Sequence, residues 1–216
     1  MKQRGDELVE KILANAGDEV PDELLNEFFS GYPIMNLQRL LKSTNEHAVK
    51  AGAWIASELG THAKPLVHGL APLMIHPLRY VRFFIVDTVL VCAGSGDGNL
   101  LALVVKMLRE TDDAVRWKGL GAIAKMTRSQ LAESLLSQDD KELAEQTVWL
   151  LRVEEELNPD LNIMKKLDAT SGIKQSFGVV AAVRVATKSL SPLKHAALSE
   201  DLDIKSFALE QLRLLG

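Results

Sequence analysis

The sequence has few of the features on which secreted and membrane-spanning proteins depend. It contains one cysteine, Cys92, so no disulfide can form within the chain, and we expect a reducing, cytoplasmic location. No run of about 18 uncharged apolar residues occurs; the nearest approach, residues 83–92, is too short and contains Asp87. The segment after Met1 is charged and lacks the apolar core of a secretory signal. We therefore expect a chain without a signal peptide or a membrane span.

Aromatic residues and positive charge are also scarce. Aromatic residues make up 5% of the sequence, and the net charge is -4. A nucleic-acid-binding protein usually carries a basic face or an excess of positive charge, so the composition argues against nucleic acid as a partner. The apolar fraction of 47% is that of an ordinary globular protein.

Patterns that mark a catalytic or metal site are missing as well. None of the five histidines has the helical spacing to a second histidine that hydrolytic zinc sites use. The glycine run at 94–98 is followed by no Gly-Lys-Ser/Thr and preceded by no strand pattern, so we interpret it as a link between two repeats. We expect no metal, no cofactor and no catalytic residues, and we expect Cys92 to be a buried core thiol.

Apolar residues recur at helical intervals along most of the chain, and alternating strand patterns are hard to find. Two apolar stripes, at 8–13 and 24–29, predict two helices, the second beginning near Pro21. We expect an all-α fold. Residues 1–32 are predicted to form N-terminal capping helices, and residues 33–216 a single continuous domain of repeated helices.

Six segments of that domain share one layout, in which a polar or acidic turn is followed by an aliphatic anchor on a helix. Successive anchors are 28 to 34 residues apart, a period typical of stacked helical hairpins. Five anchors are followed at once by Lys or Arg, which we expect to bond to the acidic turns. The anchors, predicted to face the core, are Val49, Val81, Val115, Leu143, Ile173 and Ile204.

Residues 111–123 combine an acidic turn, a Val-Arg pair and a small residue followed by leucine. This segment resembles the consensus of HEAT repeats, and residues 200–209 are similar. The resemblance covers roughly residues 33–216 and is weakest in the fourth and fifth repeats. It implies a right-handed α-solenoid of about six HEAT-like hairpins, in which neighbours bury their apolar faces together.

In HEAT-like solenoids the second helices line the concave surface. Positions two, six and nine after each anchor share one helical face and are therefore expected there. The alternative is that a one-position shift of the helix phase places these rings in the core, where we also expect Trp54. Aromatic and arginine side chains are typical of interface hot spots. The predicted partner-binding groove consists of Glu58, Phe83, Asp87, Trp117, Glu145, Trp149 and Arg152.

We expect a protein-binding module and not an enzyme. Residues 49–60 and 79–84 resemble small bacterial HEAT-like proteins found near polymorphic toxins. This resemblance implies a toxin-neutralising immunity protein, and the acidic net charge suits a basic toxin domain as its partner. Leu214 and Leu215 suggest a homodimer through the C-terminal end.

Two alternatives belong to other classes. Some HEAT-like DNA glycosylases use a set of Trp and Asp residues in a concave groove. Asp87, Trp117 and Trp149 superficially resemble such a set. Phosphate contacts need Lys and Arg, however, and the predicted groove carries Glu58 and Glu145 instead. The other alternative, a HEAT-like scaffold or phycobilin lyase subunit, has only the architecture to support it.

Overall fold

The computed structural model describes residues 4–15, 19–170 and 172–215. Within these ranges the chain is helical and has no strand, which confirms the all-α prediction. None of the described helices is both long and apolar enough to cross a lipid bilayer. The chain divides into two compact units, Met1–Ala93 and Gly94–Gly216, and the boundary falls at the glycine run that we interpreted as a link.

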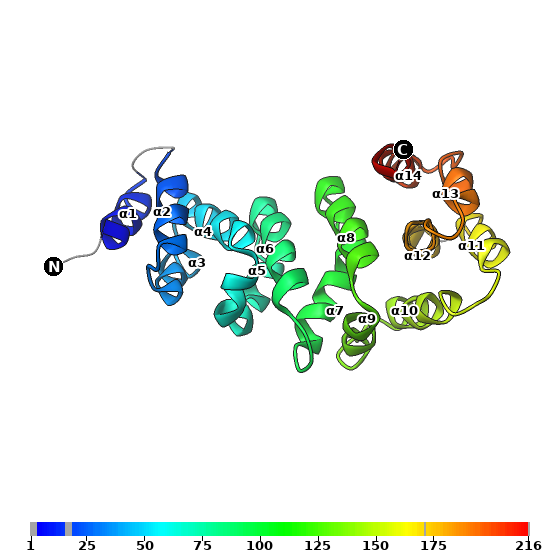
Figure 1. Ribbon diagram of the computed structural model, residues 1–216, viewed down its shortest axis with the longest axis horizontal. Coiled ribbons are helices and arrows are strands. Elements are labelled where there is room, and N and C mark those ends of the chain that lie inside the picture. The colour runs from blue at the N-terminus through cyan, green and yellow to red at the C-terminus, as the bar shows by residue number, and fades with distance from the viewer. Residues whose placement is uncertain (1–3, 16–18, 171, 216) are drawn as a thin grey trace. The chain divides into compact units, whose positions relative to one another are not determined.

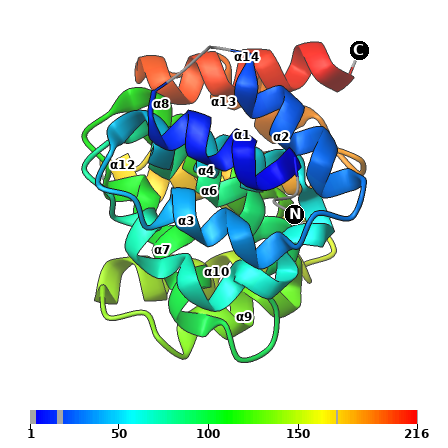
Figure 2. The same cartoon turned by 90° about the vertical axis from the view of Figure 1, so that its left-hand side faces the viewer.

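Unit 1 is built around α4, which packs against α1, α2, α3 and α6. In Figure 2, α1 lies in front of α4. The side chain of Asn45 caps α4 by accepting hydrogen bonds from the backbone N–H groups of His47 and Ala48. The elements are α1 (Arg4–Leu13), α2 (Val20–Phe29), the 3₁₀ helix η1 (Ile34–Leu37), α3 (Gln38–Leu41), α4 (Glu46–Glu58), the 3₁₀ helix η2 (Gly60–Gly69), α5 (Ala71–Met74) and α6 (Arg79–Cys92).

The two helices predicted before residue 33 are present as α1 and α2. They pack against each other, and both contact α4. Close approach of α4 to α3 depends on Gly52, because a Cβ there would lie 2.9 Å from Cβ of Leu40. Cys92 is buried, as predicted, and its thiol donates to the carbonyl oxygen of Gly60.

Unit 2 is built around α12, which packs against α8, α10, α11, α13 and α14 (Figure 1). Every residue of α12 from Ser176 to Ala182 is buried, so this helix is enclosed on all sides. The elements are α7 (Gly98–Lys106), the 3₁₀ helix η3 (Met107–Arg109), α8 (Asp113–Lys125), α9 (Arg128–Leu135), α10 (Lys141–Val153), α11 (Asp160–Leu167), α12 (Gly172–Arg184), α13 (Ser191–Ala196) and α14 (Leu202–Leu215).

Helix α8 of the predicted third repeat contacts helices of the fifth and sixth repeats, α12 and α14. Arg116 of α8 donates hydrogen bonds to Asp203 of α14, 87 residues along the chain. In a solenoid each repeat contacts only its neighbours. Contacts that skip a repeat therefore do not confirm a regular solenoid in unit 2.

The anchor pattern itself is confirmed. All six anchors are buried. Two of the basic residues that follow the anchors bond to their own turns: Arg116 reaches an acidic side chain, as expected, whereas Arg82 bonds to backbone carbonyl groups. Arg116 donates to Asp113 and to the carbonyl of Glu110, and Arg82 donates to the carbonyls of His76 and Pro77.

Candidate partner-binding surface

A shallow aromatic hollow opens on unit 1 where α2, α4 and α6 meet. It has a volume of about 360 Å³. The half-buried rings of Trp54 and Phe84 line it, together with Ala51 and Pro21. We call the surface around this hollow, on α4 and α6 with the start of α2, the α4–α6 face.

Helical spacing explains why α6 presents aromatic groups on this face. Val81, Ile85 and Val89 are buried in the core of unit 1. Tyr80 and Val91 lie on a different side of α6 and are 45% and 51% exposed. Phe84 and Asp87 fall between these two at helical intervals, and both are half-buried. One stripe along α6 therefore consists of Tyr80, Phe84, Asp87 and Val91.

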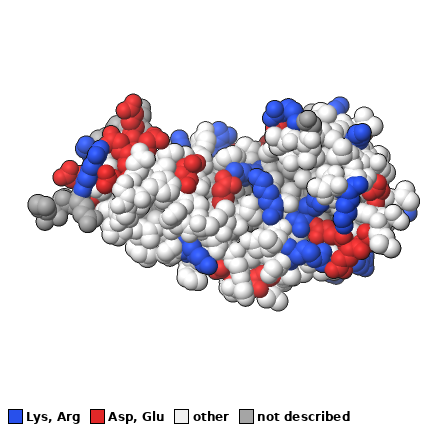
Figure 3. All heavy atoms as spheres, in the orientation of Figure 1, with Lys and Arg blue, Asp and Glu red and all other residues white. Residues whose placement is uncertain are grey.

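The edges of the α4–α6 face carry charge of both signs. Nζ of Lys50 lies 4.6 Å from the centre of the Tyr80 ring, a cation–π contact between α4 and α6. Asp22 and Glu58 are exposed, and further acidic side chains gather over α1 and α2 (Figure 3). Nε2 of His47, in the wall of the hollow, is buried without a hydrogen-bond partner among the described residues.

The predicted groove residues are divided between the two units. Glu58, Phe83 and Asp87 belong to unit 1, and the other four belong to unit 2. Glu58 is exposed on α4. Phe83 is half-buried and packs edge-on against Phe84, with ring centroids 5.7 Å apart. These three predicted residues thus lie on α4 and α6, but none of them lines the hollow itself.

Trp117, in unit 2, is engaged in packing. Its indole meets the ring of Phe207 edge-on, with centroids 5.3 Å apart. Phe207 is only 1% exposed, so the contact belongs to the edge of the core. The alternative considered for this ring, that it fills space between helices, describes Trp117 better than an open groove does.

Three residues of the predicted groove belong to α10 and lie on one side of this helix, namely Glu145, Trp149 and Arg152. Glu145 and Arg152 are exposed, and Trp149 is half-buried. Nζ of Lys166, from α11, lies 4.3 Å from the centre of the Trp149 ring. The pKa of Lys166 is lowered by burial and by the nearby charges of Lys174 and Arg152.

Sequence reasoning missed the two rings that line the hollow. Trp54 lies five positions after its anchor, one short of the offset that was expected to face a partner, and Ile55 at that offset is fully buried. Phe84 lies three positions after its anchor. Capping of α4 by Asn45 fixes where this helix begins, but no signal in the sequence states how far it is rotated.

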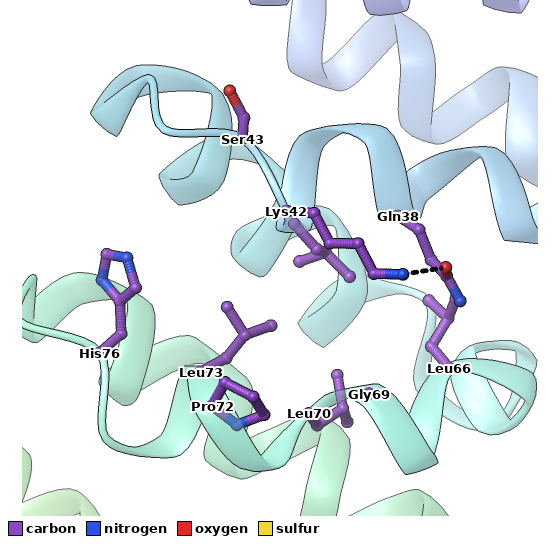
Figure 4. A pocket seen from close by; sticks show the side chains of 10 residues that line it. Gln38, Lys42, Ser43, Leu66, Gly69, Leu70, Pro72, Leu73 and His76 are labelled. Atoms are coloured by element: carbon purple, nitrogen blue, oxygen red, sulfur yellow. Dashed lines mark hydrogen bonds between the residues drawn. The ribbon is translucent and has the colours of Figure 1, made fainter.

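A second hollow in unit 1, of about 340 Å³, lies between α3 and the η2–α5 segment (Figure 4). Four leucine side chains, of Leu41, Leu66, Leu70 and Leu73, form part of its wall. Lys42 at its rim donates to Oε1 of Gln38 at 2.9 Å. Nδ1 of His76 accepts the N–H of Leu78. The polar groups that border this hollow are thus already engaged within the chain.

Unit 2 contains a largely buried ion pair between Arg184 of α12 and Glu154, the residue that follows the last residue of α10. Each side chain is 12% exposed. Arg184 also donates to the carbonyls of Ala124 and Met126, and so satisfies the carboxyl end of α8. Arg128 joins the network by donating to Glu154 at 3.1 Å. These groups hold four helices together, namely α8, α9, α10 and α12.

No protein-family model matches the sequence, and a search of curated proteins also finds no match. The resemblance to HEAT repeats and to immunity proteins therefore stays a prediction. Among the described residues, no group of three or more His, Cys, Asp or Glu is placed to hold a metal ion. The α4–α6 face combines the aromatic rings of Trp54 and Phe84 with the exposed carboxylate of Asp22 in one hollow.

Proposed function

We propose that this protein binds another protein through the α4–α6 face, and that the partner presents a basic surface there. The observation that carries the proposal is the hollow formed by Trp54 and Phe84. Aromatic anchors in a well-defined hollow dominate the binding energy of many interfaces. Both rings stand on helices packed against each other, so little conformational entropy is lost when a partner covers them.

Charge supports a basic partner. Asp22 and Glu58 are exposed at the edge of the face, and Asp87 lies within it. Carboxylates around an aromatic centre attract a positively charged surface and speed its encounter, whereas they repel an acidic one. Lys50 keeps its positive charge in the contact with Tyr80, so it offsets only one of these three negative charges.

The proposal extends to a HEAT-like, toxin-neutralising immunity protein whose partner is a basic toxin domain. The support is the sequence resemblance over residues 49–60 and 79–84. These two segments fall on α4 and α6, the helices that carry Trp54 and Phe84. A resemblance to proteins that neutralise toxins thus coincides with the surface that the geometry favours.

The test is co-expression with a toxin domain encoded beside the gene, followed by calorimetry on the purified pair. We expect protection of the cells and a complex whose affinity falls at least about 30-fold in Trp54→Ala and in Phe84→Ala, the loss typical of a hot spot. Ile75→Ala is the matched control, because Ile75 is 69% exposed on the same unit and lies outside the face. Failure to protect, or equal affinity in all variants, contradicts the proposal.

A further inference from the structure

Unit 2 carries a cluster of positively charged side chains around Trp149, contributed by α10, α11 and α12. Lys166 stacks over the indole and donates a hydrogen bond of 2.8 Å to Oε1 of Gln146. Arg152 follows Trp149 by three residues and so lies on the same side of α10. Lys174 is in the first turn of α12, which packs against both α10 and α11.

These charges are close together, and Glu145, the carboxylate on the same side of α10, pairs with Lys141. Burial lowers the pKa of Lys166, and the neighbouring charges of Lys174 and Arg152 lower it further. No carboxylate in the described ranges forms an ion pair with any of the three. Other arginines of unit 2 bond carboxylates directly, namely Arg109, Arg116, Arg128, Arg184 and Arg213.

The charge and the donors of the cluster favour a ligand with more than one negative charge. A single carboxylate carries one negative charge and would leave most of the positive charge of the cluster uncompensated. A phosphate monoester carries roughly -1.5 to -2 charges at pH 7 and has three strong acceptor oxygens. Guanidinium and ammonium groups are the side-chain donors that commonly bind phosphate. The amino end of α12, beside Lys174, adds partial positive charge.

We propose that Arg152, Lys166 and Lys174 bind a phosphate monoester, carried either by a phosphorylated side chain of a protein or by a small molecule. Lys166 is already held in place by Gln146 and Trp149, so its ammonium needs little rearrangement to receive the ligand. Arg152 and Lys174 are exposed and free to close over it. This proposal does not depend on the α4–α6 face.

Calorimetry on the full chain at fixed ionic strength tests the site. The probes are inorganic phosphate, a phosphoserine peptide, the same peptide without phosphate, and duplex DNA. We expect the first two to bind and the unphosphorylated peptide to give no heat. Arg152→Gln, Lys166→Gln and Lys174→Gln should each weaken binding about tenfold, as loss of one charge-assisted hydrogen bond does.

Lys205→Gln is the matched control, because Lys205, like Lys174, is an exposed lysine directly after an isoleucine anchor. Its affinity should equal that of the parent chain. Tighter binding of the phosphopeptide than of inorganic phosphate supports a protein-borne group, and the reverse order supports a small molecule. The proposal is overturned if neither binds at millimolar concentration, if the three variants behave like the control, or if duplex DNA binds more tightly than both.

Discussion

Trp117 of α8 and Phe207 of α14 meet edge-to-face, with their ring planes at 81° and their centroids 5.3 Å apart. Beside them, Arg116 of α8 bonds to Asp203 of α14. An aromatic pair and an ion pair therefore connect two helices that belong to the third and sixth repeats of the sequence pattern. This connection gives unit 2 its most distant contacts along the chain, and its strength can be measured.

Phe207→Ala should destabilise unit 2 by about 3–5 kcal/mol, because it removes a buried ring and leaves a cavity beside Trp117. Denaturant unfolding followed by tryptophan fluorescence measures the loss. Leu209→Ala, on the same helix but 49% exposed, is the control and should change stability little. Similar stability of the two variants would show that α14 does not pack on α8 in solution.

Arg184→Gln should also destabilise unit 2, by about 3–5 kcal/mol, because Glu154 would be left largely buried without its partner. Thermal or denaturant unfolding is the measurement. Arg213→Gln removes an arginine from an exposed pair with Glu210 and should have little or no effect. Equal effects would mean that the Arg184–Glu154 pair is solvated.

The environment of Tyr32 predicts that the stability of the protein depends on pH in the alkaline range. Its hydroxyl donates to Oδ1 of Asp6 at 2.7 Å, and burial together with this bond raises its pKa from 10.0 to about 12. Because the folded-state pKa lies above the ordinary value, the stabilisation is complete below pH 10 and is lost as the pH rises through about 12. Tyr32→Phe should be less stable than the parent chain at pH 8.

The measurement is the free energy of unfolding of both proteins at a series of pH values. The difference between them should shrink above pH 10. A difference that stays constant across this range would mean that the phenol does not titrate with the raised pKa. Titration of tyrosine absorbance should also lose its phase near pH 12 in the variant.

Self-association through α14, expected from the apolar C-terminal residues, is open to a direct test. Leu202 and Leu209 lie seven residues apart on one side of the helix and are 74% and 49% exposed. Sedimentation velocity over a range of concentrations should show a dimer that the double variant Leu202→Glu, Leu209→Glu abolishes. A parent chain that stays monomeric at high concentration would rule this interface out.

Much of the local structure was predictable because the core pattern has a helical period. The buried anchors Val81 and Val115 illustrate this, since each is completely inaccessible. The 3₁₀ geometry was not predictable: residues 60–69, with Pro65 inside, form η2, and the helical period of apolar residues does not distinguish a 3₁₀ helix from an α-helix. Proline removes a backbone donor, so such a segment cannot complete regular α-helical bonding.

The candidate site was predictable only in part. Of the predicted groove residues, Glu58 is exposed on α4 and Asp87 is half-buried on α6, but the aromatic side chain of α4 that lines the hollow is Trp54, at a position assigned to the core. Exposure of one side of a helix depends on which helices cover it, and a sequence period does not contain that information. The bond between Arg116 and Asp203 was not predictable for the same reason, because it depends on how the chain folds between two residues that are 87 positions apart.

The enclosed position of α12 has a consequence for how unit 2 assembles. Helix α12 packs against helices that come before it and after it in the chain, so its side chains are not fully buried until α14 has folded. Stability cannot then be a sum of independent repeats, as it is in arrays with nearest-neighbour contacts. Unit 2 should therefore gain or lose its structure in one cooperative step, and deletion of a single hairpin from its middle should prevent the remainder from folding.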